Sequence, residues 1–99
     1  MNVFIPDNVL KEILNILKNH RKIEKAIVFG SRAKGEHKPY SDIDIALCGQ
    51  MGMIDIEHVA SDLDELPTVY KFDVVGYSNI KNDELKKHIE NVGVIIYEK

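Results

Sequence analysis

Residues 26–47 of the chain read AIVFGSRAKGEHKPYSDIDIAL. The four apolar residues at the start predict a buried strand that ends in a tight turn at Gly30 and Ser31. A short helical segment from Arg32 to Lys34 is expected next. Backbone N–H groups at such a strand-to-helix corner converge on one point, where they bind anions and phosphates in particular. The corner is therefore a candidate phosphate-binding turn.

A second apolar strand follows, and Asp42 and Asp44 open it. Side chains alternate along a strand, so these two carboxylates share one face, about 6–7 Å apart at the backbone, while Ile43 and Ile45 point the other way. Polar residues are common near turns, but two ionised carboxylates on one face of a buried strand repel each other and lose solvation. A cation relieves both costs. With the phosphate turn upstream, the pair predicts a site for one or two Mg²⁺ ions beside a triphosphate.

The spacing of these two motifs resembles that of the nucleotidyltransferases of the DNA polymerase beta superfamily. It is most similar to the minimal members that pair with HEPN-domain proteins in prokaryotic toxin–antitoxin systems. Gly-Ser alone carries no weight and Asp-x-Asp alone carries little, whereas their fixed spacing beside two apolar strands is specific. The matching residues are Gly30, Ser31, Asp42, Asp44 and, on a later strand, Asp73. The resemblance covers nearly the whole chain and implies the polymerase beta-like fold, a mixed sheet with helices packed against it.

Asp73 lies in the largely apolar stretch 69–75. Taken alone, an Asp there is compatible with an edge strand. Its neighbours Phe72, Val74 and Val75 favour a core strand instead, in which an unpaired carboxylate would be costly. The resemblance implies that Asp73 is the third metal ligand and the general base.

The corner carries further expectations. Ser31 can cap the short helix and still donate its hydroxyl to a phosphate, so the two roles do not compete. Arg32 and Lys34 are candidates for neutralising a departing pyrophosphate. The alternative, a solvated charge on an exposed helix, fits Lys34 equally well and Arg32 less well. We therefore group Arg32 with Gly30 and Ser31 as the expected nucleotide-binding residues.

The remaining pattern alternates helices and strands, which predicts one α/β (α+β) domain over residues 1–99 with a small sheet of three to four strands. Strand directions do not follow from the pattern. Asp7 follows Pro6 and is well placed to cap the first helix, as Asn82 or Asp83 is for the last. Strands are expected at 24–29, 42–48, 69–75 and 94–97, and longer helices at 7–20, 54–66 and from Asn82 or Asp83 to Gly93.

Composition bounds the function. Thirteen basic and 16 acidic residues give a net charge of −3, and no aromatic residues alternate with a basic stripe, so a polynucleotide substrate is disfavoured. No apolar run approaches the roughly 20 residues of a membrane span, and the N-terminus lacks the features of a signal peptide. The single Cys48 cannot form an internal disulfide and is expected to pack as a small apolar side chain. A cytoplasmic protein is expected.

Two other kinds of site are not indicated. The four histidines show no metal-ligand spacing with one another or with Cys48 and are expected at the surface. The chain has no Gly-x-x-x-x-Gly-Lys-Ser/Thr motif, which excludes a P-loop ATPase. The histidines are His20, His37, His58 and His88.

These parts predict transfer of a nucleoside monophosphate from a nucleoside triphosphate to a hydroxyl. One Mg²⁺ on Asp42 and Asp44 would bridge the triphosphate oxygens, while Gly30 and Ser31 hold the β- and γ-phosphates. A second Mg²⁺, for which the resemblance adds Asp73, would lower the pKa of the acceptor hydroxyl. The resemblance also implies ATP as the nucleotide and a tyrosine of a HEPN-domain toxin as the acceptor.

Two alternatives stay open. Nucleotidyl transfer to a small molecule such as an aminoglycoside usually involves an additional domain for the acceptor, and 99 residues leave no room for one. A non-catalytic module could instead mask its partner stoichiometrically. The presence of all three carboxylates argues against the masking module, because a drifting site loses a ligand easily.

Overall fold

The computed structural model describes residues 3–35 and 41–99. One sheet contains all four strands in the order β3-β2-β1-β4. Strand β1 is antiparallel to both β2 and β4, and β2 is parallel to β3, so the expected mixed α/β sheet is confirmed. The elements are α1 (Asp7–Lys18), β1 (Lys25–Phe29), α2 (Ser31–Lys34), β2 (Ile43–Cys48), α3 (Met53–Asp64), β3 (Phe72–Gly76), the 3₁₀ turn η1 (Tyr77–Asn79), α4 (Asp83–Val92) and β4 (Val94–Glu98).

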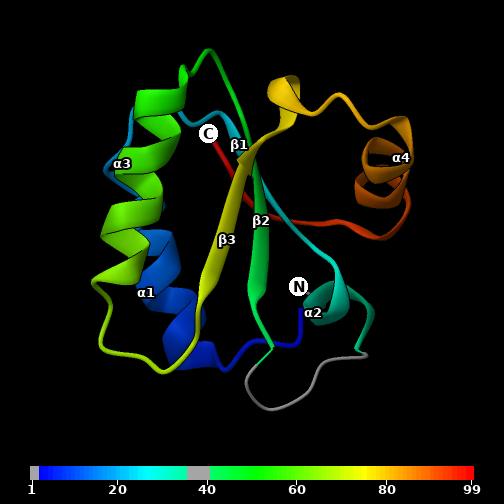
Figure 1. Ribbon diagram of the computed structural model, residues 1–99. Helices are drawn as coiled ribbons and strands as arrows, with labels where there is room; N and C mark the ends of the chain where they lie inside the picture. The colour runs from blue at the N-terminus through cyan, green and yellow to red at the C-terminus, as the bar shows by residue number, and fades with distance from the viewer. Residues whose placement is uncertain (1–2, 36–40) are drawn as a thin grey trace.

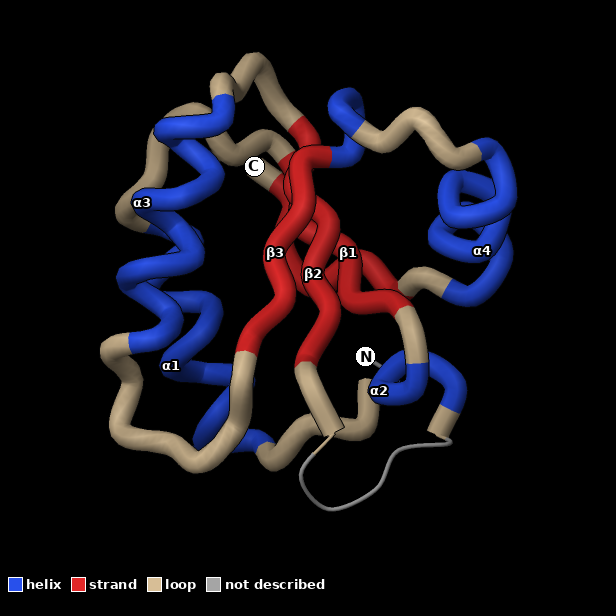
Figure 2. The backbone as a smooth tube through the Cα atoms, in the orientation of Figure 1, coloured by secondary structure: helices blue, strands red, loops and turns tan. Residues whose placement is uncertain are grey.

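Helices cover both faces of the sheet. Figure 1 shows the sheet close to edge-on, with α1 and α3 on one side and α4 on the other. The tube in Figure 2 shows the same layers. The alternation along β2 follows these layers: Ile43, Ile45 and Leu47 are buried in the core that α1 and α3 complete, while Ala46 packs with the apolar side chains of α4. Asp44 shares the face of Ala46, so it points to the α4 side.

Two expected helix caps have different outcomes. Pro6 occupies the N-cap of α1, which has no side-chain cap, and Asp7 is already helical. The predicted Asp7 cap is therefore wrong, although a carboxylate in the first turn still interacts favourably with the helix dipole. The Asn82 cap of α4 is confirmed, because its side-chain oxygen accepts hydrogen bonds from the N–H groups of Glu84 and Leu85.

Strand β3 differs from its expectation in length and in position. It begins at Phe72 because the chain bends after Pro67 and leaves Val69 71% exposed. It also lies at the edge of the sheet, and Asp73 is exposed. The core strand predicted for Asp73 is wrong, and the edge alternative holds. At the edge the carboxylate keeps its water, so its position costs little.

The polar connection expected around Pro39 and Tyr40, together with His37, lies outside the described residues. Among the helices that are described, none is both long enough and apolar enough to cross a membrane.

Candidate active site

Three neighbouring strands bring the predicted site residues together. Strand β1 ends at Phe29, directly before the Gly30 corner, and Phe29 lies opposite Asp44 in the antiparallel pair. Asp44 in turn lies opposite Asp73 in the parallel pair. Neighbouring strands are about 5 Å apart, and paired residues point to the same face of a sheet. The corner, Asp44 and Asp73 therefore form a row across β1, β2 and β3 on the side of α4.

Gly30 is required at the corner for two separate reasons. Its φ of 73° lies in the left-handed region that favours glycine. A Cβ at this position would also overlap the Asp44 carboxylate oxygen Oδ2. The backbone of the corner thus lies directly against the Asp44 carboxylate. A phosphate that contacts both the corner and a cation on Asp44 would need this short distance.

Ser31 begins α2 and Gly30 is its N-cap, so the expected Ser31 cap is wrong. Within the described residues the Ser31 hydroxyl has no hydrogen-bond partner. It remains a candidate donor to a phosphate. Lys34 ends α2 and is exposed, as the alternative for this residue expected.

The three carboxylates act on one another. The pKa of Asp44 is raised to about 6, first by its burial and then by the negative charges of Asp73 and Asp42. Asp42 and Asp73 are exposed, so most of the desolvation falls on the middle carboxylate. This row has an excess of negative charge that a cation would relieve.

Side chains that could ligate a metal do not form a finished site. In the part of the chain that the structure describes, no group of three His, Cys, Asp or Glu side chains converges closely enough to hold an ion as it stands. The donors themselves fit Mg²⁺, because it binds carboxylate oxygens and keeps several waters. Asp42 and Asp73 are exposed and can rotate toward Asp44. The ligand set Asp42, Asp44 and Asp73 remains a prediction with a suitable donor set.

Arg32 is buried and is not a solvated charge at the surface. It is 2% exposed, and its guanidinium donates to the carbonyls of Phe4 at 3.0 Å and Ser41 at 3.2 Å. The same group lies over the ring of Tyr70, 4.9 Å from the centroid. Arg32 therefore joins the corner to the N-terminal segment, to the residue before Asp42 and to the loop before β3. Direct contact with nucleotide stays a prediction.

His88 is the site residue that the sequence analysis missed. Its Nε2 accepts a hydrogen bond from the backbone N–H of Gly30 at 3.1 Å, and its ring meets Phe29 edge to face. The surface position expected for His88 is wrong, since the side chain is half-buried. An Nε2 that accepts places the ring proton on Nδ1. The amide expected to bind phosphate is thus paired with a histidine of α4.

A signal for His88 was present in the sequence. Leu85 and Ile89 are the apolar residues of the last helix, and a residue three after the first and one before the second lies at the margin of their stripe. Such a position is half-buried and close to the sheet. Spacing to other metal ligands does not detect such a position.

Comparison with known proteins defines the class. The family model described as "Polymerase beta, Nucleotidyltransferase" matches residues 11–99. The chain belongs to this family and is a nucleotidyltransferase, as the resemblance implied. Two chains of Methanocaldococcus jannaschii, each named "putative protein adenylyltransferase", are 33% and 36% identical to it over 93 residues. Both alignments cover 82% of this chain and 91% of the relative.

Solved structures share the fold. A structure described as a toxin-antitoxin with AMP-PNP superposes with a TM-score of 0.76 at 22% identity, over 91% of this chain and 73% of the other. The complex of a tri-AMPylated Shewanella oneidensis HEPN toxin with an MNT antitoxin gives 0.72 at 18% identity, over 96% and 74%. A structure described as a "putative nucleotidyltransferase from Sulfolobus solfataricus" gives 0.59 at 22% identity, over 93% and 79%.

Proposed function

We propose that this nucleotidyltransferase moves AMP from ATP to a tyrosine hydroxyl of a partner HEPN-domain toxin and so acts as its antitoxin. The observation that carries the proposal is the row formed by the Gly30 corner, Asp44 and Asp73 on three adjoining strands. The names of the Methanocaldococcus jannaschii relatives support protein as the acceptor class. The AMPylated toxin found with an antitoxin of the same fold supports a toxin as the acceptor.

Each part of the row has a role in this reaction. Gly30 and Ser31 hold the β- and γ-phosphates, and Asp42 and Asp44 hold the Mg²⁺ that accompanies the nucleotide, with Asp73 as the third ligand where a second ion binds. Bound Mg²⁺ supplies charge neutralisation on the phosphates and a lower pKa for the acceptor hydroxyl. Asp73 takes the proton of that hydroxyl.

The reaction balances without another reactant. The acceptor oxygen forms a bond to the α-phosphorus, and the bond from that phosphorus to the β-phosphate oxygen breaks. Pyrophosphate leaves on the side of Gly30 and Ser31, and the proton passes from Asp73 to solvent. Arg32 contributes by holding the corner in place through Phe4 and Ser41.

The proposal is tested by co-expressing the chain with the product of the neighbouring reading frame and purifying the complex. ATP labelled at the α-phosphate should transfer label to the partner, and γ-labelled ATP should not. The intact mass of the partner should rise by one or more AMP units, and Asp42→Asn should abolish the rise. Label from the γ-position would instead define a kinase.

The carboxylates should differ in what they contribute. Asp42→Asn should abolish Mg²⁺-dependent ATP binding, whereas Asp73→Asn should lower turnover by about 100-fold or more and ATP affinity by less than about tenfold, since its role concerns the acceptor. Calorimetric titration with Mg-ATP, with folding checked by circular dichroism, separates the two. Equal losses of affinity would contradict the division of roles.

One observation favours the masking module as a second candidate. The Gly30 amide is already paired with His88, so the ligand-free corner is satisfied without a phosphate. A masking module predicts a stable, growth-protecting complex whose partner stays unmodified, and it predicts that Asp42→Asn still protects. Growth protection that is lost in Asp42→Asn supports the enzyme.

A further inference from the structure

Strand β3 presents an unpaired edge. Among the described strands it pairs only with β2. The N–H of Ile43 donates to the carbonyl of Lys71, and in a parallel ladder the next β3 residues whose backbone groups face β2 are Asp73 and Val75. The N–H and C=O groups of the residues between them, including Val74, therefore point away from the sheet. Such an edge is a template for another strand.

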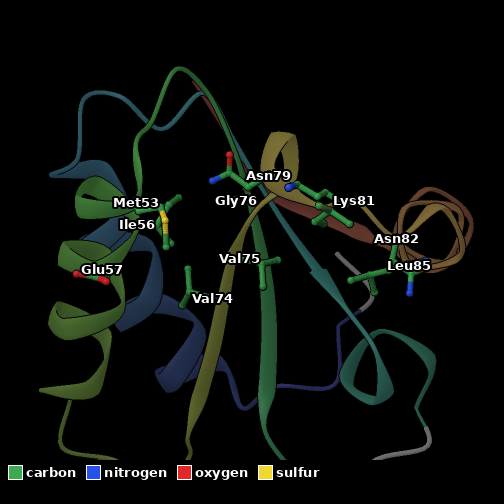
Figure 3. A pocket seen from close by; sticks show the side chains of 11 residues that line it. Met53, Ile56, Glu57, Val74, Val75, Gly76, Asn79, Lys81, Asn82 and Leu85 are labelled. Atoms are coloured by element: carbon green, nitrogen blue, oxygen red, sulfur yellow. The ribbon is translucent and has the colours of Figure 1, made fainter.

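A hollow of about 470 Å³ wraps this edge and opens on both faces of β3. Figure 3 shows lining side chains on the α3 side and on the α4 side of the strand. A strand added to an edge sends its side chains alternately to the two faces, so it needs apolar room on both. The apolar lining consists of Met53, Ile56 and Val74 on the α3 side, and of Val75, Ile80 and Leu85 on the α4 side.

The lining of the hollow is mostly apolar and includes one acidic and one basic side chain, Glu57 on the α3 side and Lys81. Met53 is 73% exposed at its rim. Asp73 lies on β3 two residues before Val75, and Lys81 lines the hollow beyond the other end of the strand. Lys81 forms no ion pair within the described part of the chain. An occupant with a negative charge toward Lys81, and none toward Asp73 or Glu57, would complement these charges.

The direction of the reaction leads to the same edge. In-line displacement puts the acceptor oxygen opposite the leaving pyrophosphate. The proposed pyrophosphate position is the corner after β1, Asp44 lies on β2, and Asp73 lies on β3. A line from leaving group to acceptor therefore crosses the sheet from β1 to β3 and passes out over the edge of β3.

We propose that an extended segment of the acceptor protein adds to β3 as a fifth strand and brings its hydroxyl to Asp73. This inference rests on the proposed function. The residue opposite Asp73 carries the hydroxyl, and an apolar residue two positions away occupies the Val75 and Leu85 side of the hollow. The residue between them enters the Met53 side, and an acidic residue further along faces Lys81. Recognition thus depends on the spacing of apolar residues around the acceptor.

Two variants test the groove without touching the site. Met53→Asp puts a charge at the rim, and Ile54→Asp is its matched control, because Ile54 is 68% exposed on the same helix and does not line the hollow. Both place an acidic residue in the first turn of α3, where it is tolerated. Gly76→Pro removes one outward N–H, and the φ of −86° at Gly76 is close to the range of proline. The Asn79 side chain must move, and Ile56 Cδ1, 3.3 Å from an added Cβ, must shift slightly.

The probes are two fluorescent nonapeptides of equal composition, each with one tyrosine and an acidic end. In the first peptide, apolar residues occupy the two positions before the tyrosine and the two positions after it. In the second, they lie four or more positions away. Anisotropy without ATP should show at least tenfold tighter binding of the first peptide. Met53→Asp and Gly76→Pro should each weaken its binding about tenfold, and Ile54→Asp less than twofold.

Each other outcome has a defined meaning. Equal binding of the two peptides, no binding of either up to millimolar concentration, or equal behaviour of the Met53 and Ile54 variants overturns the groove. A dimer seen by light scattering and lost in Gly76→Pro assigns the edge to a second copy and also overturns it. Tighter binding of the first peptide without any AMP transfer supports the groove and contradicts the proposed function. Unchanged AMP transfer to the partner protein in every variant supports the proposed function and contradicts the groove. If Gly76→Pro fails to fold, Met53→Asp against Ile54→Asp decides.

Discussion

Gly30 and Ser31, the two residues of the corner, have different roles that neighbouring residues cannot take over. Gly30 combines a left-handed backbone with direct contact to the Asp44 carboxylate, so both its conformation and its lack of a side chain matter. Ser31 contributes one hydroxyl that is unengaged within the described residues. The two adjacent positions should therefore respond very differently to alanine.

We expect Gly30→Ala to lower turnover by about 100-fold or more, and Ser31→Ala by about tenfold or less. The new methyl group at position 30 would push Asp44 away and strain a backbone with positive φ, at about 1–2 kcal/mol of folding stability. Single-turnover transfer of α-labelled AMP, with thermal unfolding of each variant, measures both effects. A Gly30→Ala protein as active as Ser31→Ala would remove the corner from the site.

Asp44 should make the ligand-free chain sensitive to pH. In the folded state the pKa of Asp44 is about 6, above its ordinary value of 3.8, so the folded state binds the proton more tightly than the unfolded state. The contribution of Asp44 to the free energy of unfolding is therefore fully present below about pH 4 and is lost as the pH rises through 6. Asp44→Asn should therefore be more stable than the parent at pH 8, by no more than about 1 kcal/mol because the carboxylate is half-exposed, and equal to it at pH 4.

Denaturant unfolding at pH 4, 6 and 8 without Mg²⁺ measures the difference. Asp42→Asn is the control, because Asp42 is exposed and contributes the smallest of the three causes of the raised pKa. A difference between parent and Asp44→Asn that does not change with pH would contradict the charge repulsion in the row.

Among the elements, α4 connects the far side of the sheet to the corner. It packs over Phe29 and Ala46 through Ile89 and places His88 against the Gly30 amide. A histidine on a helix thereby orients a backbone group at the end of β1. Under the proposed function His88 is a positioning residue, since it contacts the corner and would act on nucleotide only through it.

We expect His88→Ala to raise the KM for ATP about tenfold while kcat changes little, because the corner loses its orientation before the phosphates bind. His88→Gln keeps an acceptor atom on the same helix face and should restore most of the affinity. Steady-state kinetics with the partner protein, and melting temperatures for all three proteins, make the comparison. If both variants lose stability equally and keep the parental KM, His88 is only a packing residue.

The elements also show what the sequence could predict. The strands β1 and β2 follow from apolar runs that end in a glycine turn or begin with Asp-x-Asp, and their alternation correctly assigns Asp44 to one face and Ile45 to the other. These signals are local. The edge position of β3 and the contact of His88 with Gly30 depend on strand order and on helix docking between residues 58 positions apart. No local pattern encodes the edge position of β3 or the contact with Gly30, so the burial of Asp73 was wrongly predicted. The half-burial of His88 is different, because the stripe of Leu85 and Ile89 indicates it.

Across the whole molecule, Arg32 connects segments that are distant in sequence. Phe4 and Arg32 exchange hydrogen bonds, because the Phe4 N–H donates to the Arg32 carbonyl at 2.9 Å while the guanidinium donates to the Phe4 carbonyl. The same guanidinium reaches Ser41 and the ring of Tyr70. One buried side chain thus holds together the N-terminal segment, the corner, the entry to β2 and the loop before β3.

Arg32→Lys should separate this structural role from contact with nucleotide. Lysine keeps the charge, but a single ammonium cannot serve two carbonyls and a ring face as the planar guanidinium does. We expect the free energy of unfolding to fall by about 2–3 kcal/mol, which lowers the melting temperature by about 10 °C or more for a chain of this size. The affinity for Mg-ATP, measured well below the melting temperature, should stay within about threefold of the parent. Tyr70→Leu, which removes only the ring contact, is the control for a general loss of packing. A stable Arg32→Lys protein with strongly weakened ATP binding would instead indicate that the guanidinium contacts the phosphates.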